Sequence, residues 1–157
     1  MRATKYAVLL AALISVAGCQ GSGGAVSMRW RIIDLSTGGV YDPHDQGQPD
    51  GSCECPQAQC TQRPWTVERV RLIVLDAAGA EVFPDEPRLV FPCSAREATT
   101  PFFLPTGSFG LTLVAYDPSN PTADTRALSP PPTVRDILPA SKINLDVVGI
   151  GVNGQTP

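Results

Sequence analysis

Apolar and polar residues alternate with a period of two in several stretches of the chain, which is typical of β-strands that bury one face. Met28, Trp30 and Ile32 share one face of a predicted strand over residues 27–35. The run VERVRLIVLD over residues 67–76 repeats the pattern and gives the strongest strand prediction in the chain. The alternation therefore predicts a sheet protein.

Proline divides the middle of the chain into further short elements. Strands are predicted over residues 81–83 and 88–91. Pro84 and Pro87 cannot donate ladder hydrogen bonds, so they are expected to lie outside these strands. Three consecutive prolines within residues 127–133 predict an extended loop.

The C-terminal third contains two more alternating runs. Pro105 and Gly107 predict a turn. A strand is predicted after this turn, and one of its faces carries Phe109, Leu111, Leu113 and Ala115. A final strand is predicted over residues 142–152. Its predicted apolar face carries Ile143, Leu145 and Val147.

About seven short strands separated by turns predict an all-β fold, a single antiparallel β-sandwich of the Ig-like or transthyretin-like type. No apolar stripe of 3.6-residue period extends beyond about ten residues, as an amphipathic helix would require. The domain is expected to cover residues 28–152, with a cystine-bearing loop at 36–64 and a C-terminal tail at 153–157.

The N-terminal segment has a different pattern from the rest of the chain. Arg2 and Lys5 precede an apolar run over residues 7–17, and this order predicts a cleaved signal peptide over residues 1–18. The run is shorter than the roughly 20 apolar residues that a membrane-spanning helix needs.

The tetrapeptide Val16-Ala17-Gly18-Cys19 resembles the bacterial lipobox. The resemblance implies that Cys19 becomes the first residue of a lipoprotein and carries three acyl chains. Two or more acyl chains give stable anchoring, so the protein is expected to stay on its membrane. Gln20 replaces the aspartate that retains lipoproteins in the inner membrane, so the resemblance implies the outer membrane of the cell envelope. Residues 19–27 are rich in Gly and Ser and predict a flexible tether. An ordinary secretory signal peptide with a chance cysteine is the alternative.

The mature part shows a second resemblance. The pattern Phe102-x-Leu104-Pro105-x-Gly107-x-Phe109, continued by alternating apolar residues to Ala115, is similar to carboxypeptidase-regulatory-like and transthyretin-like sandwich modules. Together with the hairpin over residues 70–82 it covers about a third of the chain. Such modules are usually non-catalytic, which the resemblance implies for this domain.

Charge narrows the range of partners. The chain has 12 basic and 15 acidic residues, and removal of Arg2 and Lys5 with the signal peptide makes the domain more acidic. A mildly acidic domain is a poor candidate for binding nucleic acid or an anionic membrane surface.

Four cysteines follow the tether. In an oxidising compartment, Cys53, Cys55, Cys60 and Cys93 predict two disulfides. A bond between Cys53 and Cys55 would close a strained ring, so one local bridge to Cys60 and one long bridge to Cys93 are expected. The alternative, a zinc site of four thiolates, lacks the usual paired CxxC spacing.

The loop over residues 36–64 is the predicted binding region, because long loops in compact domains are often functional. Its candidate residues, with the tryptophan that follows it, are Tyr41, Asp42, His44, Asp45, Asp50 and Trp65. Their spacing lacks the alternating donors of an EF-hand calcium loop, so no metal is predicted. Trp65 is either an exposed ligand platform or a tryptophan at the edge of the core.

No catalytic or cofactor motif is present. His44 is the only histidine, and a hydrolase would have to use it as the base. Asp85 and Glu86 are adjacent, and adjacent side chains usually diverge, so they do not suggest an acid/base pair. The sequence favours a membrane-anchored, non-catalytic binding module whose partner is another envelope protein or a glycan. A purely structural envelope lipoprotein is the alternative.

Overall fold

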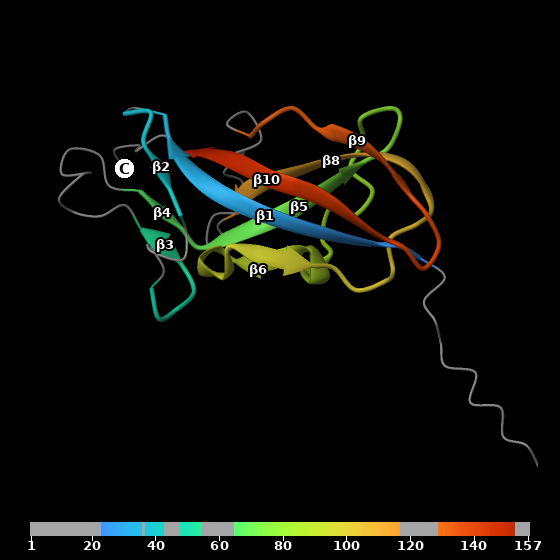
Figure 1. Ribbon diagram of the computed structural model, residues 1–157, viewed down its shortest axis with the longest axis horizontal. Coiled ribbons are helices and arrows are strands. Elements are labelled where there is room, and N and C mark those ends of the chain that lie inside the picture. The colour runs from blue at the N-terminus through green and yellow to red at the C-terminus, as the bar shows by residue number, and fades with distance from the viewer. Residues whose placement is uncertain (1–22, 36, 43–47, 55–64, 117–128, 153–157) are drawn as a thin grey trace, which may run out of the picture.

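The computed structural model describes residues 23–35, 37–42, 48–54, 65–116 and 129–152 (Figure 1). Its strands are β1 (Ala25–Asp34), β2 (Val40–Tyr41), β3 (Cys53–Glu54), β4 (Thr66–Val67), β5 (Arg69–Leu75), β6 (Val90–Pro92), β7 (Glu97–Thr99), β8 (Gly107–Tyr116), β9 (Thr133–Ile137) and β10 (Lys142–Val152). Two 3₁₀ turns, η1 (Pro87–Leu89) and η2 (Cys93–Ala95), flank β6. The described residues contain no helix long and apolar enough to cross a membrane.

Two four-stranded sheets form the body of the domain. The first has the order β10-β1-β2, with β7 also paired to β1, and the second has the order β6-β5-β8-β9. β3 and β4 pair with each other in a separate two-stranded antiparallel sheet. Apolar side chains of both sheets are buried between them, with Trp30, Ile32, Leu72 and Leu113 among the largest. The predicted all-β sandwich is confirmed.

One strand pair differs from the antiparallel expectation. β1 and β10 are parallel, with Ala25 opposite Lys142 and Asp34 opposite Val152. In Figure 1 both strands begin at the right-hand end and run side by side. A parallel pair requires a crossover connection, and here nearly the whole domain provides it. Local alternation reports which face a residue occupies and not which strand lies beside it, so the sequence did not reveal this pairing.

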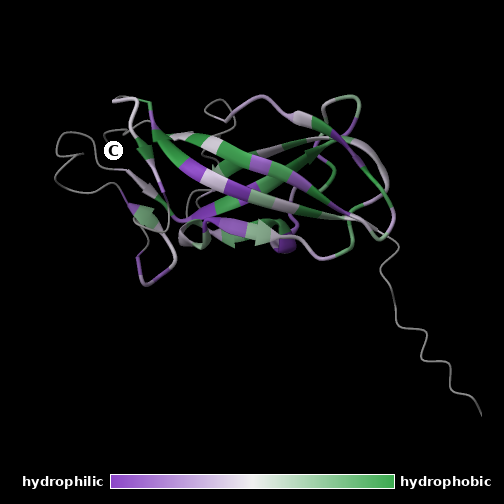
Figure 2. Ribbon diagram, in the orientation of Figure 1, coloured by the Kyte–Doolittle hydropathy of each residue, from purple (hydrophilic) through white to green (hydrophobic). Residues whose placement is uncertain are grey.

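The predicted apolar face of β1 is confirmed. Met28, Trp30 and Ile32 are buried between the sheets, whereas Arg29 and Arg31 are exposed. Figure 2 shows the corresponding alternation of apolar and polar positions along β1. A side chain on every second residue points to the same side of a strand, and burial selects which set is apolar.

The predicted face of β10 is wrong at Val147. Ser27 lies opposite Asn144 but Arg29 lies opposite Val147, so β10 contains one extra residue at this point. This β-bulge reverses the alternation, since every later side chain changes face. Val147 is therefore 53% exposed, whereas Ile150 is fully buried.

Of the two strands predicted over residues 81–83 and 88–91, the first is absent and the second is confirmed only at Val90 and Phe91, in β6. Glu81 forms only an isolated bridge with Leu75, and residues 81–83 form no strand. Residues 87–89 form η1, and Glu86 caps this turn by accepting a hydrogen bond from the Arg88 N–H. Pro87 fixes its own φ in the helical range, which favours a turn over an extended start. Pro84 lies outside the strands, as expected.

The loop predicted over residues 127–133 ends one residue earlier than expected, because a strand begins at Thr133. Thr133 is the first residue of β9, where a loop was predicted up to this position. Before it, the Pro130 carbonyl accepts a hydrogen bond of 3.0 Å from the Thr112 hydroxyl on the outer face of the second sheet. β9 is an edge strand with one neighbour, β8. Only Ile137 of β9 is buried, so this strand has no run of alternating apolar residues that would predict it from the sequence.

The first strand begins earlier than predicted. β1 starts at Ala25, and Gly24 already forms a bridge with Leu104, so the last residues of the expected tether belong to the sandwich. Composition suggested flexibility at these positions, but hydrogen-bond partners from distant parts of the chain hold them. The predicted loop over 36–64 likewise contains β2 and β3.

Candidate functional site

A disulfide holds the predicted binding loop against the body of the domain. Cys53 on β3 is bonded to Cys93 at the start of η2, with 5.6 Å between their Cα atoms, and both residues are buried. Trp30 Nε1 donates a hydrogen bond of 2.9 Å to the Cys93 carbonyl oxygen. The Cys53–Cys93 disulfide agrees with the expected long bridge to Cys93. Cys55 and Cys60 lie outside the described residues.

Trp65 is a core-edge tryptophan and not an exposed platform. Only 6% of it is exposed, and its ring meets the Tyr41 ring edge-on at a centroid distance of 5.9 Å. Its Nε1 is buried without a hydrogen-bond partner among the described residues. The sequence left both alternatives open, and the structure selects the second.

The acidic residues of the loop make contacts within the domain. Asp42 lies 3.6 Å from the Arg96 guanidinium. Asp50 Oδ1 accepts hydrogen bonds from the Ser52 N–H and hydroxyl, at 2.8 and 2.7 Å, and the Ser52 hydroxyl bond is the main cause that lowers the pKa of Asp50. Among the described residues, no three His, Cys, Asp or Glu side chains form a group suited to a metal. His44 and Asp45 lie outside the described residues.

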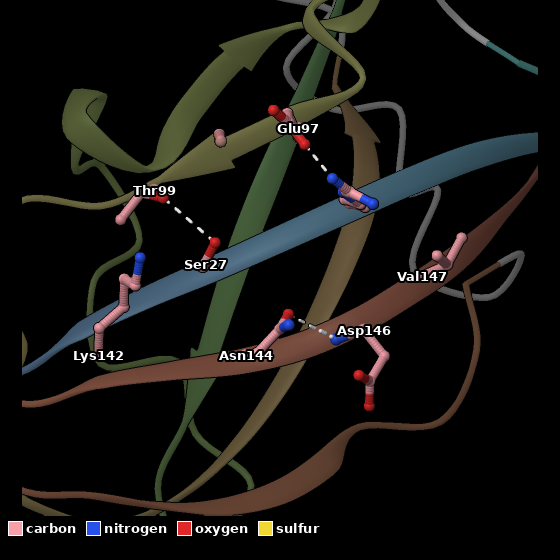
Figure 3. Close-up of a pocket in the computed structure, with 9 residues that line it drawn as sticks. Ser27, Glu97, Thr99, Lys142, Asn144, Asp146 and Val147 are labelled. Carbon is pink, nitrogen blue, oxygen red and sulfur yellow. Dashed lines mark hydrogen bonds and ion pairs between the residues drawn. The ribbon is translucent and has the colours of Figure 1, made fainter.

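A polar groove lies on the outer face of the first sheet (Figure 3). Its volume is about 670 Å³, within the range of ligand sites in proteins. The groove is formed by side chains of β1, β7 and β10. They are Ser27, Arg29, Glu97, Ala98, Thr99, Lys142, Asn144, Asp146 and Val147.

Hydrogen bonds within the groove fix several of these side chains. Arg29 Nε donates to Glu97 Oε2 at 2.8 Å, and the Thr99 hydroxyl donates to the Ser27 hydroxyl at 3.2 Å. Both contacts join β1 to β7, as Figure 3 shows. The backbone pairing of β1 with β7 sets the distance between these strands, and the two contacts orient the side chains along it.

The opposite wall is shaped by the β-bulge in β10. Asp146 has a φ of 58°, in the left-handed region that aspartate tolerates better than most residues. Its N–H donates to the Asn144 side-chain oxygen at 3.0 Å, which stabilises the local turn. The extra residue leaves Asp146 and Val147 both exposed. Bulges often redirect side chains beside functional sites.

The electrostatics of the groove are mixed. Arg29 and Lys142 are cationic, and Glu97 and Asp146 are anionic. The Arg29–Glu97 pair has more than half of each side chain exposed. Exposed ion pairs contribute little to stability, so these two charges can exchange partners with a bound ligand at small cost. The arrangement suits a polar ligand that carries hydroxyls, amides or charges of both signs.

This groove is not predicted by the sequence. Its members come from three strands that are distant in the chain, and each residue alone resembles a solvated strand face. One indication was present, because the apolar phase of β10 shifts between Leu145 and Val148, and the shift coincides with Asn144 and Asp146. Polar residues that accept left-handed backbone at a break in alternation indicate a bulge.

The chain matches no protein-family model, no curated protein and no solved structure. The similarity of residues 102–115 to transthyretin-like modules therefore stays a prediction, and the groove has to be interpreted from its own chemistry.

Proposed function

We propose that this protein is a lipid-anchored, non-catalytic binding module of the cell envelope, and that the groove between β7 and β10 binds its partner. The observation that carries the proposal is the bulge at Asp146, which places both Asp146 and Val147 in the lining of the polar groove. The partner is a glycan or a polar segment of another envelope protein.

The chemistry of the groove supports a polar partner. Ser27, Thr99 and Asn144 offer hydroxyl and amide groups, and Arg29 and Glu97 offer charges of both signs. A rigid sheet positions these groups without a large loss of entropy on binding, because the backbone is already ordered. Val147 adds one exposed apolar contact.

The anchor is supported by the N-terminal sequence. The basic start, the short apolar run and the lipobox-like residues before Cys19 occur in the order that lipoprotein precursors require. An anchored domain meets partners in the plane of the membrane, which raises their effective concentration. Modest affinity in the groove is then sufficient for function.

Photo-crosslinking in intact cells tests the proposed groove. A photoreactive residue replaces Val147, which is 53% exposed in the groove, or Val134, which is 66% exposed on the other sheet and serves as the matched control. We expect a crosslinked partner at Val147 and not at Val134. Arg29→Ala should abolish the adduct, whereas Arg135→Ala on β9 should leave it.

Other outcomes assign different functions. No adduct at Val147, or the same adducts at Val147 and Val134, contradicts binding in the groove and favours a purely structural lipoprotein. If His44→Ala with Asp45→Ala abolishes an adduct that Arg29→Ala leaves intact, the partner binds the loop over residues 36–64.

A further inference from the structure

The chain enters the sandwich between two loops at one end of the domain. The Ala140 N–H donates to the Gly23 carbonyl oxygen at 3.1 Å, and Gly24 exchanges backbone hydrogen bonds with Leu104 at 2.9 and 3.2 Å. The next residue, Ala25, donates to the Ser141 carbonyl oxygen at 2.8 Å. We call this end, formed by Gly23–Gly24 and the loops over residues 101–106 and 138–141, the entry pole.

At the entry pole, the backbone of Gly23 and Gly24 lies very close to the backbones of the two loops. A Cβ atom on Gly23 would lie 2.5 Å from the Leu104 carbonyl oxygen, and one on Gly24 would lie 2.8 Å from the Leu138 carbonyl oxygen. Only glycine fits between these backbones. The path of the chain is therefore fixed from Gly23 onward.

Both loops of the entry pole expose a large apolar side chain. Phe102 is 45% exposed and Leu138 is 60% exposed. Neither belongs to the core, whereas the adjacent Phe103 packs edge-on against Phe83. Lys142, directly after the second loop, is also exposed. Exposed apolar side chains held near a membrane can bury themselves at the boundary between headgroups and acyl chains.

The length of the tether determines what this end can reach. If Cys19 is the acylated first residue, only residues 20–22 separate it from Gly23. Four Cα–Cα steps of an extended chain span about 14 Å. The entry pole must therefore stay within about 14 Å of the level of Cys19 at the membrane. The far end of β1 lies about 30 Å from the entry pole along the strand.

We infer that the entry pole is a membrane-contact surface, in which Phe102 and Leu138 insert into the interfacial layer of the same membrane that holds the acyl chains. The inference rests on the proposed lipid anchor and adds an orientation to it. β1 and β10 then run away from the membrane. The groove at Asn144 and Asp146 lies on the side of the upright domain, above the lipid surface.

Depth-dependent fluorescence quenching tests the inference on the full lipidated protein in vesicles that contain brominated phospholipids. Phe102→Trp places a reporter at the entry pole, and Val40→Trp is the matched control at the far end of β1, where Val40 lies opposite Ile33 and is 58% exposed. Trp30 and Trp65 are buried, and the wild-type protein measured in the same vesicles gives their background. We expect at least twofold quenching and a blue shift for Phe102→Trp alone.

The outcomes separate the inference from the proposed anchor. If the protein sediments with the vesicles and Phe102→Trp is quenched no more than Val40→Trp, the entry pole does not contact lipid, although the anchor exists. If the protein carries no acyl chains and does not sediment with vesicles, both the anchor and the inferred orientation are wrong. Circular dichroism of each variant verifies that it is folded.

Discussion

The Gly24 N–H donates a hydrogen bond of 2.9 Å to the Leu104 carbonyl oxygen, and the Leu104 N–H returns one of 3.2 Å to Gly24. This reciprocal pair lies five residues after Cys19. It ties the start of the domain to the loop that precedes β8. If Cys19 carries the proposed lipid, only residues 20–22 separate that lipid from the residues that this hydrogen-bonded pair fixes.

The close approach at Gly23 predicts a sensitive position. Gly23→Ala should destabilise the domain by about 1–3 kcal/mol, because the new methyl group would meet the backbone of Phe103 and Leu104, which cannot move aside cheaply. Gly149→Ala is the matched control, since its nearest obstacle is the end of the flexible Ile33 side chain. Urea denaturation measures both. An equal loss of stability in the two variants would contradict the fixed entry of the chain.

The two tryptophans are expected to respond differently to replacement by phenylalanine. Trp30→Phe removes the donor of the bond to Cys93 and leaves a buried carbonyl oxygen, which costs about 1–3 kcal/mol. Trp65→Phe removes a buried Nε1 that has no described partner, so its cost should be at least about 1 kcal/mol smaller. Denaturation followed by circular dichroism compares them. A larger loss for Trp65→Phe would show that its Nε1 has an important partner.

The disulfide between Cys53 and Cys93 should stabilise the domain strongly. The two residues are 40 positions apart, and closing a loop of this length contributes about 4 kcal/mol in the chain-entropy model. Cys53→Ala with Cys93→Ala should lose a comparable amount in urea denaturation and still fold. Peptide mapping of the unreduced protein should recover the Cys53–Cys93 linked peptide. Recovery of Cys93 linked to Cys55 or Cys60 would contradict the structure.

The Glu86–Arg88 pair predicts a pH dependence at the acidic end. Hydrogen bonds from the Arg88 side chain, and then from its N–H, lower the pKa of Glu86 from 4.5 to about 2. Because the folded-state pKa is below the unfolded value, the pair stabilises the fold above about pH 4.5, and this contribution is lost as the pH falls toward 2. Carboxyl NMR titration should detect Glu86 titrating near pH 2 and returning toward 4.5 in Arg88→Gln. A wild-type value near 4.5 would exclude the pair.

The sequence predicted best the strands whose two faces differ strongly in polarity. On β1, Met28, Trp30 and Ile32 are buried as expected, whereas Arg29 and Arg31 on the other face are exposed. Prediction failed where partners from distant parts of the chain decide the structure. The bridge at Gly24, the strand β9 and the parallel pairing of β10 all depend on such partners.

The candidate site was harder to predict than the fold. The loop residues Tyr41, Asp42, Asp50 and Trp65 were chosen for their chemistry, but each makes a contact within the domain. The groove instead depends on the bulge at Asp146, and a change of one residue in register is visible only when the partner strand is known. Spacing along one strand cannot reveal a surface that three strands build together.

Mass spectrometry of the mature N-terminal peptide tests whether the domain is held at a membrane through Cys19. We predict that the first residue is Cys19 and that its mass includes acyl chains, with Cys19→Ala leaving the protein in the soluble fraction of lysed cells. An unmodified Cys19, a mature N-terminus at another residue, or a Cys19→Ala variant that still fractionates with membranes would contradict the lipid anchor.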